Sequence, residues 1–229
     1  VETEDMSEIF ADAAEVSDAQ AQAKAEEIRG YANICPGISE EKVLKQARLI
    51  VALENWMRDH HCDASAIQCW DSVEANYGCA ACLAMSMMGS KGMPSACETD
   101  VMGAVSMLAL LKAGGVPPIY QDWDNNYATV PDKCVNVHCC NYPVSAFTEK
   151  PELANLDILG AERSFGALKG RVRPSAMTYL KVSTDDRRGV IKCYLGEGRF
   201  TDDELHTFGG VAVCEVPNLN GLMHYICKN

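Results

Sequence analysis

The sequence predicts an α/β fold followed by a mostly β region, that is, a parallel, Rossmann-like α/β layer with a C-terminal antiparallel, β-barrel-like domain. Between residues 65 and 124, strand-like and helical runs alternate, which is typical of a parallel α/β layer. Beyond residue 130, short strand-like runs are separated by turn residues, which favours an antiparallel sheet. We therefore expect an α/β domain over residues 1–115 and a β-rich domain over residues 116–229.

Helices are expected at the start of the chain. Residues 7–30 are acidic, rich in alanine and end in Gly30, so they predict one or two surface helices. A longer helix is predicted over residues 40–61, with Ser39 as its N-cap and apolar residues at helical spacing. His60 and His61 close this helix, where a cation complements the helix dipole, and we interpret them as structural.

The alternating region follows. Strands are predicted over 65–70, 93–98 and 116–124, and helices over 78–92 and 99–115, the last one ending at a pair of glycines. In the β-rich part, strands are predicted over 133–141, 166–174, 176–183, 189–198 and 209–216. Residues 183–189, STDDRRG, have the composition of a hairpin connection.

Charge and composition exclude several classes of protein. The formal net charge is -12, and such a surface repels nucleic-acid phosphates and anionic lipid, so we expect neither partner. No apolar run approaches the ~20 residues that span a bilayer. Several of the 12 cysteines lie in apolar or strand-like runs, which favours reduced thiols and a cytoplasmic protein. Because the chain begins without methionine and ends within an amphipathic segment, we expect a fragment of a longer protein.

Two carboxylates are the principal candidates for a functional site. Glu98 ends a predicted strand, and Asp122 ends the strand-like run PPIYQD, with no convincing helix after it to cap. Ligands in parallel α/β sheets bind at the carboxyl ends of strands, so this pair could hold Mg²⁺ or Mn²⁺ or act as acid and base. The alternative for Glu98 is structural, because residues 95–98, SACE, fit a helix capping box. Asp100 is interpreted as an ordinary helix-start acid.

Histidines and a CxxC pair are secondary candidates. His138 lies near the end of a predicted strand and is either a metal ligand or a hydrogen-bonded structural residue. His206, in a polar turn, and His224, in a terminal helix, are weaker candidates. Cys79 and Cys82 have the spacing of a zinc or thiol-redox site, but no second CxxC or CxxH pair accompanies them.

The run CWDSVEANYGCAACLAMSMMGSKGMPSACETDVMGAVSMLALL, continued by PPIYQDWDNN, resembles the metal-dependent L-fucose isomerase / L-arabinose isomerase superfamily. It is most similar to the shorter L-fucose isomerase-like proteins. The segments VNVHCCNYP, GRVRPSAMTYLKVSTDDRRGVIKCYLGEG and NLNGLMHYICKN support the same resemblance. The order and spacing of these segments are more specific than any one of them.

The resemblance implies an aldose–ketose isomerase that works through an ene-diol intermediate. It implies that Glu98 and Asp122 bind a divalent cation, Mn²⁺ or another such as Mg²⁺, and shuttle protons between C1 and C2 of an open-chain sugar. His138 corresponds to a further metal ligand of the arabinose-isomerase branch. It also implies a monosaccharide substrate, a homo-oligomer (trimer, tetramer or hexamer), and a chain that lacks the family's N-terminal domain and extreme C-terminus.

Two alternatives remain open at this stage. A non-catalytic sugar-binding or regulatory descendant would keep the same fold without turnover. A thiol or zinc protein would use Cys79 and Cys82 instead of the carboxylates. Manganese bound to oxygen would separate the first interpretation from the last.

Overall fold

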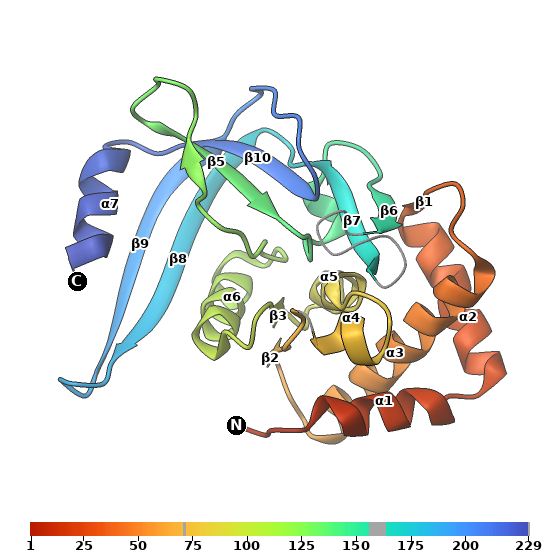
Figure 1. Cartoon of the computed structure of the whole chain (residues 1–229). Coiled ribbons are helices and arrows are strands. Elements are labelled where there is room, and N and C mark those ends of the chain that lie inside the picture. Colours follow the sequence, from red (N-terminus) through yellow and green to blue (C-terminus); the bar gives the residue numbers. More distant parts are fainter. Residues whose placement is uncertain (71, 156–163, 229) are drawn as a thin grey trace.

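The structure is a computed structural model that describes residues 1–70, 72–155 and 164–228. It is a mixed α/β fold in which helices lie beside a large mixed sheet (Figure 1). The coarse α/β prediction is therefore confirmed. Asp71, within the first stretch of the resemblance, and Asn229, at the end of the predicted β-rich domain, lie outside the described residues.

The predicted N-terminal helices are confirmed, and their first turns are capped by side chains. Helices α1 (Met6–Glu15), α2 (Asp18–Tyr31) and α3 (Glu40–Asp59) have Asp5, Ser17 and Ser39 as their N-caps. These side chains accept hydrogen bonds from backbone N–H groups that have no partner within the helix. His60 is the C-cap of α3, as expected for a structural histidine.

The alternating region forms two short parallel strands and three helices. Strand β2 (Ser65–Ala66) pairs with β3 (Ser95–Ala96) in parallel. The helices are α4 (Ser72–Asn76), α5 (Cys82–Ser90) and α6 (Val101–Gly114). Gly115 ends α6 in the left-handed conformation, at φ 68°, which glycine adopts without steric cost. The predicted glycine stop is thus confirmed.

The predicted strand over residues 116–124 is wrong. In the structure this segment forms no strand, and the next paired residues are β4 (Asn125–Asn126). Pro117 and Pro118 have no N–H group to donate to a sheet, which is a physical reason for the absence. The Rossmann-like layer is therefore not confirmed, because among the described residues the parallel pair β2–β3 has no third strand.

The larger sheet contains the predicted β-rich region. Its strands are β1 (Asn33–Ile34), β4, β5 (Lys133–His138), β6 (Glu152–Asn155), β7 (Phe165–Arg171), β8 (Ser175–Asp185), β9 (Val190–Phe200) and β10 (Gly210–Glu215). The order is β1-β6-β7-β10-β5-β4, and β9 also pairs with β10 and with β8. Pairs β1–β6 and β7–β10 are parallel, and the others are antiparallel.

This sheet is open, so the predicted barrel is not found among the described strands. The hairpin β8–β9 extends away from the helical part, and the C-terminal helix α7 (Leu219–Lys228) lies beside it (Figure 1). A short 3-10 helix, Val144–Ala146, follows β5. Within the described residues, no helix combines the length and apolar character that crossing a membrane requires.

The main core joins both parts of the chain. Buried side chains of α3 and α5, such as Ile50 and Leu83, belong to the same cluster as Phe165 and Leu168 of β7. Gln46 of α3 is fully buried and donates from Nε2 to the carbonyls of Ala80 (2.6 Å) and Phe165 (2.8 Å). The predicted domain boundary at residue 115 stays a prediction, since this core spans it.

Candidate functional site

Glu98 lies in a tight turn directly after strand β3. The Asp100 N–H donates to the Cys97 carbonyl at 3.1 Å, and both central residues have positive φ, 57° at Glu98 and 58° at Thr99. This conformation costs a residue with a Cβ about 1–2 kcal/mol. The Glu98 side chain is exposed. Strained backbone that presents an exposed carboxylate is more typical of a functional residue than of a helix cap.

The capping-box alternative for Glu98 is wrong, because Ser95 lies in β3 and Asp100 is the N-cap of α6. The Asp100 carboxylate accepts a hydrogen bond from the Gly103 N–H at 2.8 Å. Asp100 is thus the helix-start acid that the sequence predicted, but it has further partners. Its Oδ2 accepts from the Tyr120 hydroxyl at 2.8 Å and from the Lys181 ammonium of β8. Asp100 therefore connects α6 to the hairpin β8–β9.

Asp122 is held by strand β5 rather than by a strand of its own. Asn136, fully buried in β5, donates from Nδ2 to the Asp122 carbonyl at 2.8 Å. Two residues further on, Asp124 exchanges hydrogen bonds with the backbone of β5, accepting from the Val137 N–H at 2.6 Å. Asp122 is exposed, yet partial burial still raises the pKa of its carboxyl.

His138 is the last residue of β5, as the sequence predicted, and its side chain is only 4% exposed. Burial lowers the pKa of its imidazole to about 4, against the opposing charges of Glu98 and Asp124, so the ring is neutral at pH 7. Its Nδ1 is buried without a hydrogen-bond partner among the described residues. The Tyr120 ring packs edge-on against it, with centroids 5.6 Å apart. A neutral imidazole with a free ring nitrogen has the form that binds a metal ion.

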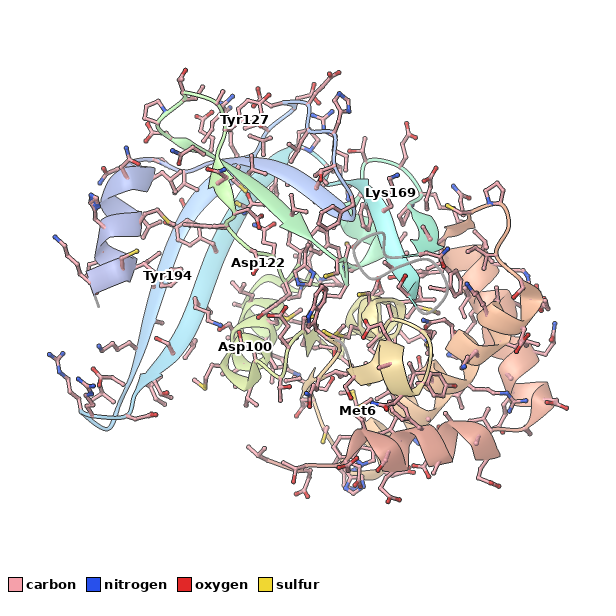
Figure 2. All side chains as sticks on the ribbon, viewed as in Figure 1. Met6, Asp100, Asp122, Tyr127, Lys169 and Tyr194 are labelled. Atoms are coloured by element: carbon pink, nitrogen blue, oxygen red, sulfur yellow. The ribbon has the colours of Figure 1, made fainter. Side chains whose placement is uncertain are left out.

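The charges of the two candidate carboxylates both act at the end of β5. Burial raises the pKa of the Cys139 thiol to about 12, and the charges of Glu98 and Asp122 add to this rise. Figure 2 shows Asp100 and Asp122 on the same side of the molecule, with Tyr194 on the neighbouring hairpin. However, no group of three His, Cys, Asp or Glu side chains is close enough to hold a metal ion within the described part of the chain.

Tyr120 and Lys181 were not singled out from the sequence. Tyr120 contacts Asp100 through its hydroxyl and His138 through its ring, so it joins the two halves of this region. Its position two residues before Asp122 was a signal that could have identified it. Lys181 carries no such signal, because its role depends on where the hairpin folds back onto α6.

The CxxC alternative is not supported. Cys79 and Cys82 are both buried, and burial raises the pKa of Cys79 to about 12 and that of Cys82 well above its ordinary value. Thiols with such pKa values stay protonated at neutral pH and are poor nucleophiles and ligands. All 12 cysteines are free thiols in the structure.

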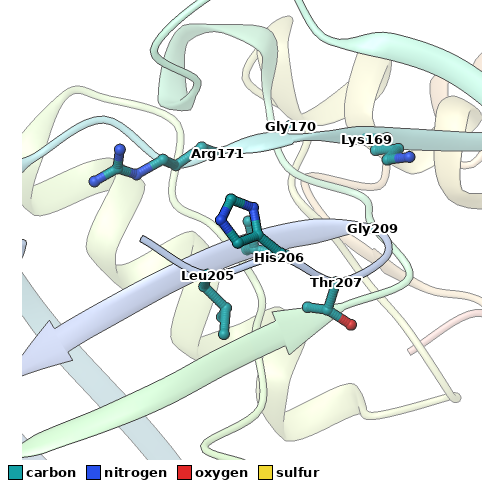
Figure 3. A pocket seen from close by; sticks show the side chains of 8 residues that line it. Lys169, Gly170, Arg171, Leu205, His206, Thr207 and Gly209 are labelled. Atoms are coloured by element: carbon teal, nitrogen blue, oxygen red, sulfur yellow. The ribbon is translucent and has the colours of Figure 1, made fainter. Parts of the chain in front are cut away.

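His206 and His224 stay away from the carboxylates. His206 is exposed, with its Nε2 3.5 Å from Glu204 Oε2, and it lines a pocket of about 500 Å³ with Lys169, Arg171 and Thr207 (Figure 3). Arg171 at this pocket is paired with Asp202 at 2.9 Å. His224 lies in α7 at the far end of the molecule (Figure 1). Neither histidine joins the region around Glu98.

Parts of this chain are similar to known proteins. Residues 136–229 match the family model described as L-fucose isomerase, C-terminal domain. The chain is also similar to sulfoquinovose isomerase of Alkalicoccus urumqiensis, with 36% identity over 77 residues, which cover 33% of this chain and 17% of that protein. The sulfoquinovose isomerase of Priestia megaterium is 32% identical over 85 residues, covering 37% of this chain and 19% of that protein.

The sulfoquinovose isomerase of Clostridium sp. (strain MSTE9) is 31% identical over 75 residues, or 33% of this chain and 17% of that protein. The chain thus spans less than a fifth of the length of the curated relatives it matches. These relatives are named isomerases, which agrees with the resemblance seen in the sequence. Residues 136–229 are thus similar to the C-terminal domain of L-fucose isomerase, and the family match covers less than half of the chain.

Proposed function

We propose that this chain is part of an aldose–ketose isomerase in which Glu98 and Asp122 bind a divalent cation and move protons on an open-chain sugar. The carrying observation is the strained turn at Glu98, which presents an exposed carboxylate whose charge, like that of Asp122, acts on the Cys139 thiol at the end of β5. The family match of residues 136–229 supports the reaction class. The assignment of Glu98 and Asp122 as site residues rests on the backbone turn and the exposure of the carboxylates described above.

The candidate ligands are of the chemical types that bind divalent cations. Glu98 and Asp122 supply hard oxygen ligands of the kind that Mn²⁺ and Mg²⁺ prefer. His138 is a candidate third ligand because its Nδ1 is buried, neutral and without a partner among the described residues. Since no three such groups converge in the described residues, water, substrate oxygens or a residue outside this chain would complete the coordination.

A cation at this position would polarise the carbonyl and hydroxyl oxygens at C1 and C2 of the sugar and so acidify the carbon-bound proton. One carboxylate of the pair Glu98 and Asp122 removes that proton, and an ene-diol of the sugar results. The partner returns a proton to the adjacent carbon. Partial burial raises the pKa of the Asp122 carboxyl, which is the direction that makes a carboxylate a better proton acceptor.

The relatives suggest which sugars to test first. Three of the similar proteins are named sulfoquinovose isomerase, and the matching family model is named for L-fucose. We therefore propose an aldose substrate, with sulfoquinovose and L-fucose as the first two probes. We further propose that the protein is cytoplasmic and works as a homo-oligomer.

The test combines metal binding with turnover on the intact protein. Mn²⁺ is titrated by calorimetry into the wild type and into Glu98→Gln, with Glu8→Gln, an exposed helix position, as the matched control. We expect Glu98→Gln to weaken Mn²⁺ binding by at least about 100-fold, because loss of even an outer-shell partner costs 10–100-fold. Glu8→Gln should bind Mn²⁺ like the wild type.

Turnover is then measured with both sugars after chelation and after re-addition of Mn²⁺. Activity that chelation abolishes and Mn²⁺ restores, and that Glu98→Gln and Asp122→Asn both lack, supports the proposal. Undiminished Mn²⁺ binding and turnover in Glu98→Gln would contradict the site assignment. Mn²⁺ and sugar binding without any turnover would instead indicate the non-catalytic sugar-binding descendant.

A further inference from the structure

Two buried cysteines meet beside the Glu98 turn. Cys69 Sγ and Cys97 Sγ are 2.8 Å apart, although 28 residues separate them along the chain. The contact follows from the parallel pair β2–β3, because Cys69 comes shortly after β2 and Cys97 comes directly after β3. The Ile67 N–H bonds to the Ala96 carbonyl at 3.0 Å, and the Thr99 N–H bonds to the Ile67 carbonyl at 3.2 Å, so both segments are held in place.

The separation is close to that of a covalent bond. A disulfide has its sulfurs about 2.05 Å apart, so the two thiols need to approach by less than about 1 Å. Cys69 and Cys97 are 4% and 1% exposed, but each is followed by an exposed residue, Trp70 and Glu98. Each thiol is thus adjacent in sequence to a residue at the surface, and local opening of these segments would admit a small oxidant.

We propose that Cys69 and Cys97 are a redox modification site that forms a reversible disulfide and thereby restrains the turn carrying Glu98. The oxidant is hydrogen peroxide. One thiol, as thiolate, attacks a peroxide oxygen, so that an S–O bond forms, the O–O bond breaks and the departing hydroxide takes up the thiol proton as water. The second thiol attacks the resulting sulfenic sulfur, so that the S–S bond forms and a second water leaves.

The overall step is balanced. Two thiols and one H₂O₂ give one disulfide and two waters, with the cysteines losing two electrons and the peroxide gaining them. A dithiol reverses the step by thiol–disulfide exchange. In a reducing compartment such a disulfide is transient, as redox-sensing disulfides are.

The turn that carries Glu98 is the element that the disulfide would restrain. Cys97 provides the carbonyl that closes this turn, and Glu98 and Thr99 form its centre at positive φ. The covalent link would fasten Cys97 to the segment after β2, to which Thr99 is already hydrogen-bonded. Opening of the turn then requires that both segments move together. This consequence concerns the backbone and does not depend on the metal or on the isomerase reaction.

A second pair of buried cysteines in this chain serves as a control for the oxidation of Cys69 and Cys97. Cys134 of β5 and Cys214 of β10 lie directly opposite each other in the antiparallel register and are equally buried. They lie in the interior of a sheet, whereas Cys69 and Cys97 lie in loops beyond strand ends. Oxidation that followed burial or cysteine content alone would affect both pairs or neither.

The test uses the wild-type chain, reduced and then treated with one to ten equivalents of hydrogen peroxide. Free thiols are alkylated while the chain is unfolded in denaturant, so that buried thiols are also labelled, and peptides are mapped without reduction by mass spectrometry. We expect a Cys69–Cys97 linked peptide, about 2 Da lighter than the two thiol peptides together, that dithiothreitol removes. Cys97→Ala should lack it, and Cys193→Ser, at an exposed position of β9, should keep it.

A second measurement needs no variant. Amide hydrogen exchange of residues 97–100 should slow by about 10-fold in the oxidised wild type and return on reduction. A link found at Cys134–Cys214 while Cys69 and Cys97 stay alkylatable would overturn the proposal. So would over-oxidation of single thiols without a link. A Cys69–Cys97 link with unchanged exchange at residues 97–100 would overturn its effect on the Glu98 turn.

Discussion

The helical core and the hairpin β8–β9 are stabilised in different ways. In α3 and α5, consecutive turns are buried, and Leu49, Ile50 and Leu83 have no exposed surface. In the hairpin, all residues from Ser175↔Phe200 to Asp185↔Val190 pair across the two strands, but Ile191 and Leu195 are 74% and 64% exposed. The core is therefore held by burial of apolar surface, whereas the hairpin is held by its own backbone ladder and a few anchoring contacts.

The difference explains where the candidate site lies. Asp100 at the start of α6 pairs with Lys181 of the hairpin, and the Val182 N–H donates to Ser106 Oγ of α6 at 2.9 Å. Glu98 comes from the well-packed side, two residues before Asp100. Asp122 comes from the segment 116–124, which is hydrogen-bonded to β5 through Asn136. The candidate site thus lies where the rigid core meets the less buried sheet.

The largest expected effect contrasts the two regions directly. Leu83→Ala, in the fully buried face of α5, should lower the free energy of unfolding by about 2–5 kcal/mol through lost burial and a cavity. Leu195→Ala, on exposed β9, should change it by less than about 0.5 kcal/mol. Urea unfolding followed by circular dichroism measures both. An equally large cost for Leu195→Ala would show that the hairpin face is covered in solution.

A smaller effect is expected at the polar contact that joins the two parts of the core. Gln46→Ala removes the donor to the carbonyls of Ala80 and Phe165. The Phe165 carbonyl still accepts from the Ala80 N–H at 2.8 Å, so the Ala80 carbonyl is the group that loses its side-chain donor. We expect a loss of about 2–3 kcal/mol in the same unfolding assay, since buried groups without partners are costly. Gln22→Ala, exposed on α2, serves as the control and should be nearly neutral. An unchanged free energy of unfolding in Gln46→Ala would mean that a water molecule donates to these carbonyls in place of the Gln46 amide.

The smallest effect concerns the anchor between core and hairpin, and it depends on pH. Burial raises the pKa of Asp100, but the Lys181 ammonium and the Gly103 and Tyr120 donors outweigh it, so the pKa lies below its ordinary value. A carboxyl with a lowered folded-state pKa stabilises the fold above its unfolded pKa of about 3.9 and loses that stability on acidification. Asp100→Asn should therefore cost about 1 kcal/mol at pH 7.

The difference between wild type and Asp100→Asn should shrink as the pH falls through the folded-state pKa of Asp100. Unfolding curves from pH 7 down to about pH 2 measure it, since the contribution is lost only below the unfolded pKa of about 3.9. Asp12→Asn on the exposed face of α1 is the control. A constant difference over this range would show that the lost contribution is the cap geometry and not the charge. A difference that grows on acidification would contradict the direction of the pKa shift.

Much of the local structure followed from local signals. Ser39 begins α3 and Gly115 ends α6, because a side-chain cap and a left-handed glycine act through nearby backbone groups. The strand-like runs around Val135, Tyr179 and Val213 became strands β5, β8 and β10. In the same way, the placement of His138 at the end of β5 could be predicted.

Other features could not be predicted from the same signals. Residues 116–124 alternate like a strand, but the prolines prevent pairing, and the segment instead binds along β5 through Asn136. The capping box around Glu98 was mistaken because Ser95 joined β3, which only the parallel partner β2 decides. The barrel did not form because sheet closure depends on how distant strands meet, and composition does not specify this.

By itself the sequence determined the helices, most strands, the acidic surface and the choice of Glu98, Asp122 and His138 as candidates. Their chemical types and their positions beside turn and strand signals are local properties. The remaining features depend on the tertiary structure. They are the positive φ of Glu98, the hydrogen bond that joins Asp122 to β5, the buried His138 Nδ1 without a partner among the described residues, and the contact of Cys69 with Cys97. Each of these depends on segments far apart in the chain, and contacts of that kind arise only when the whole core packs.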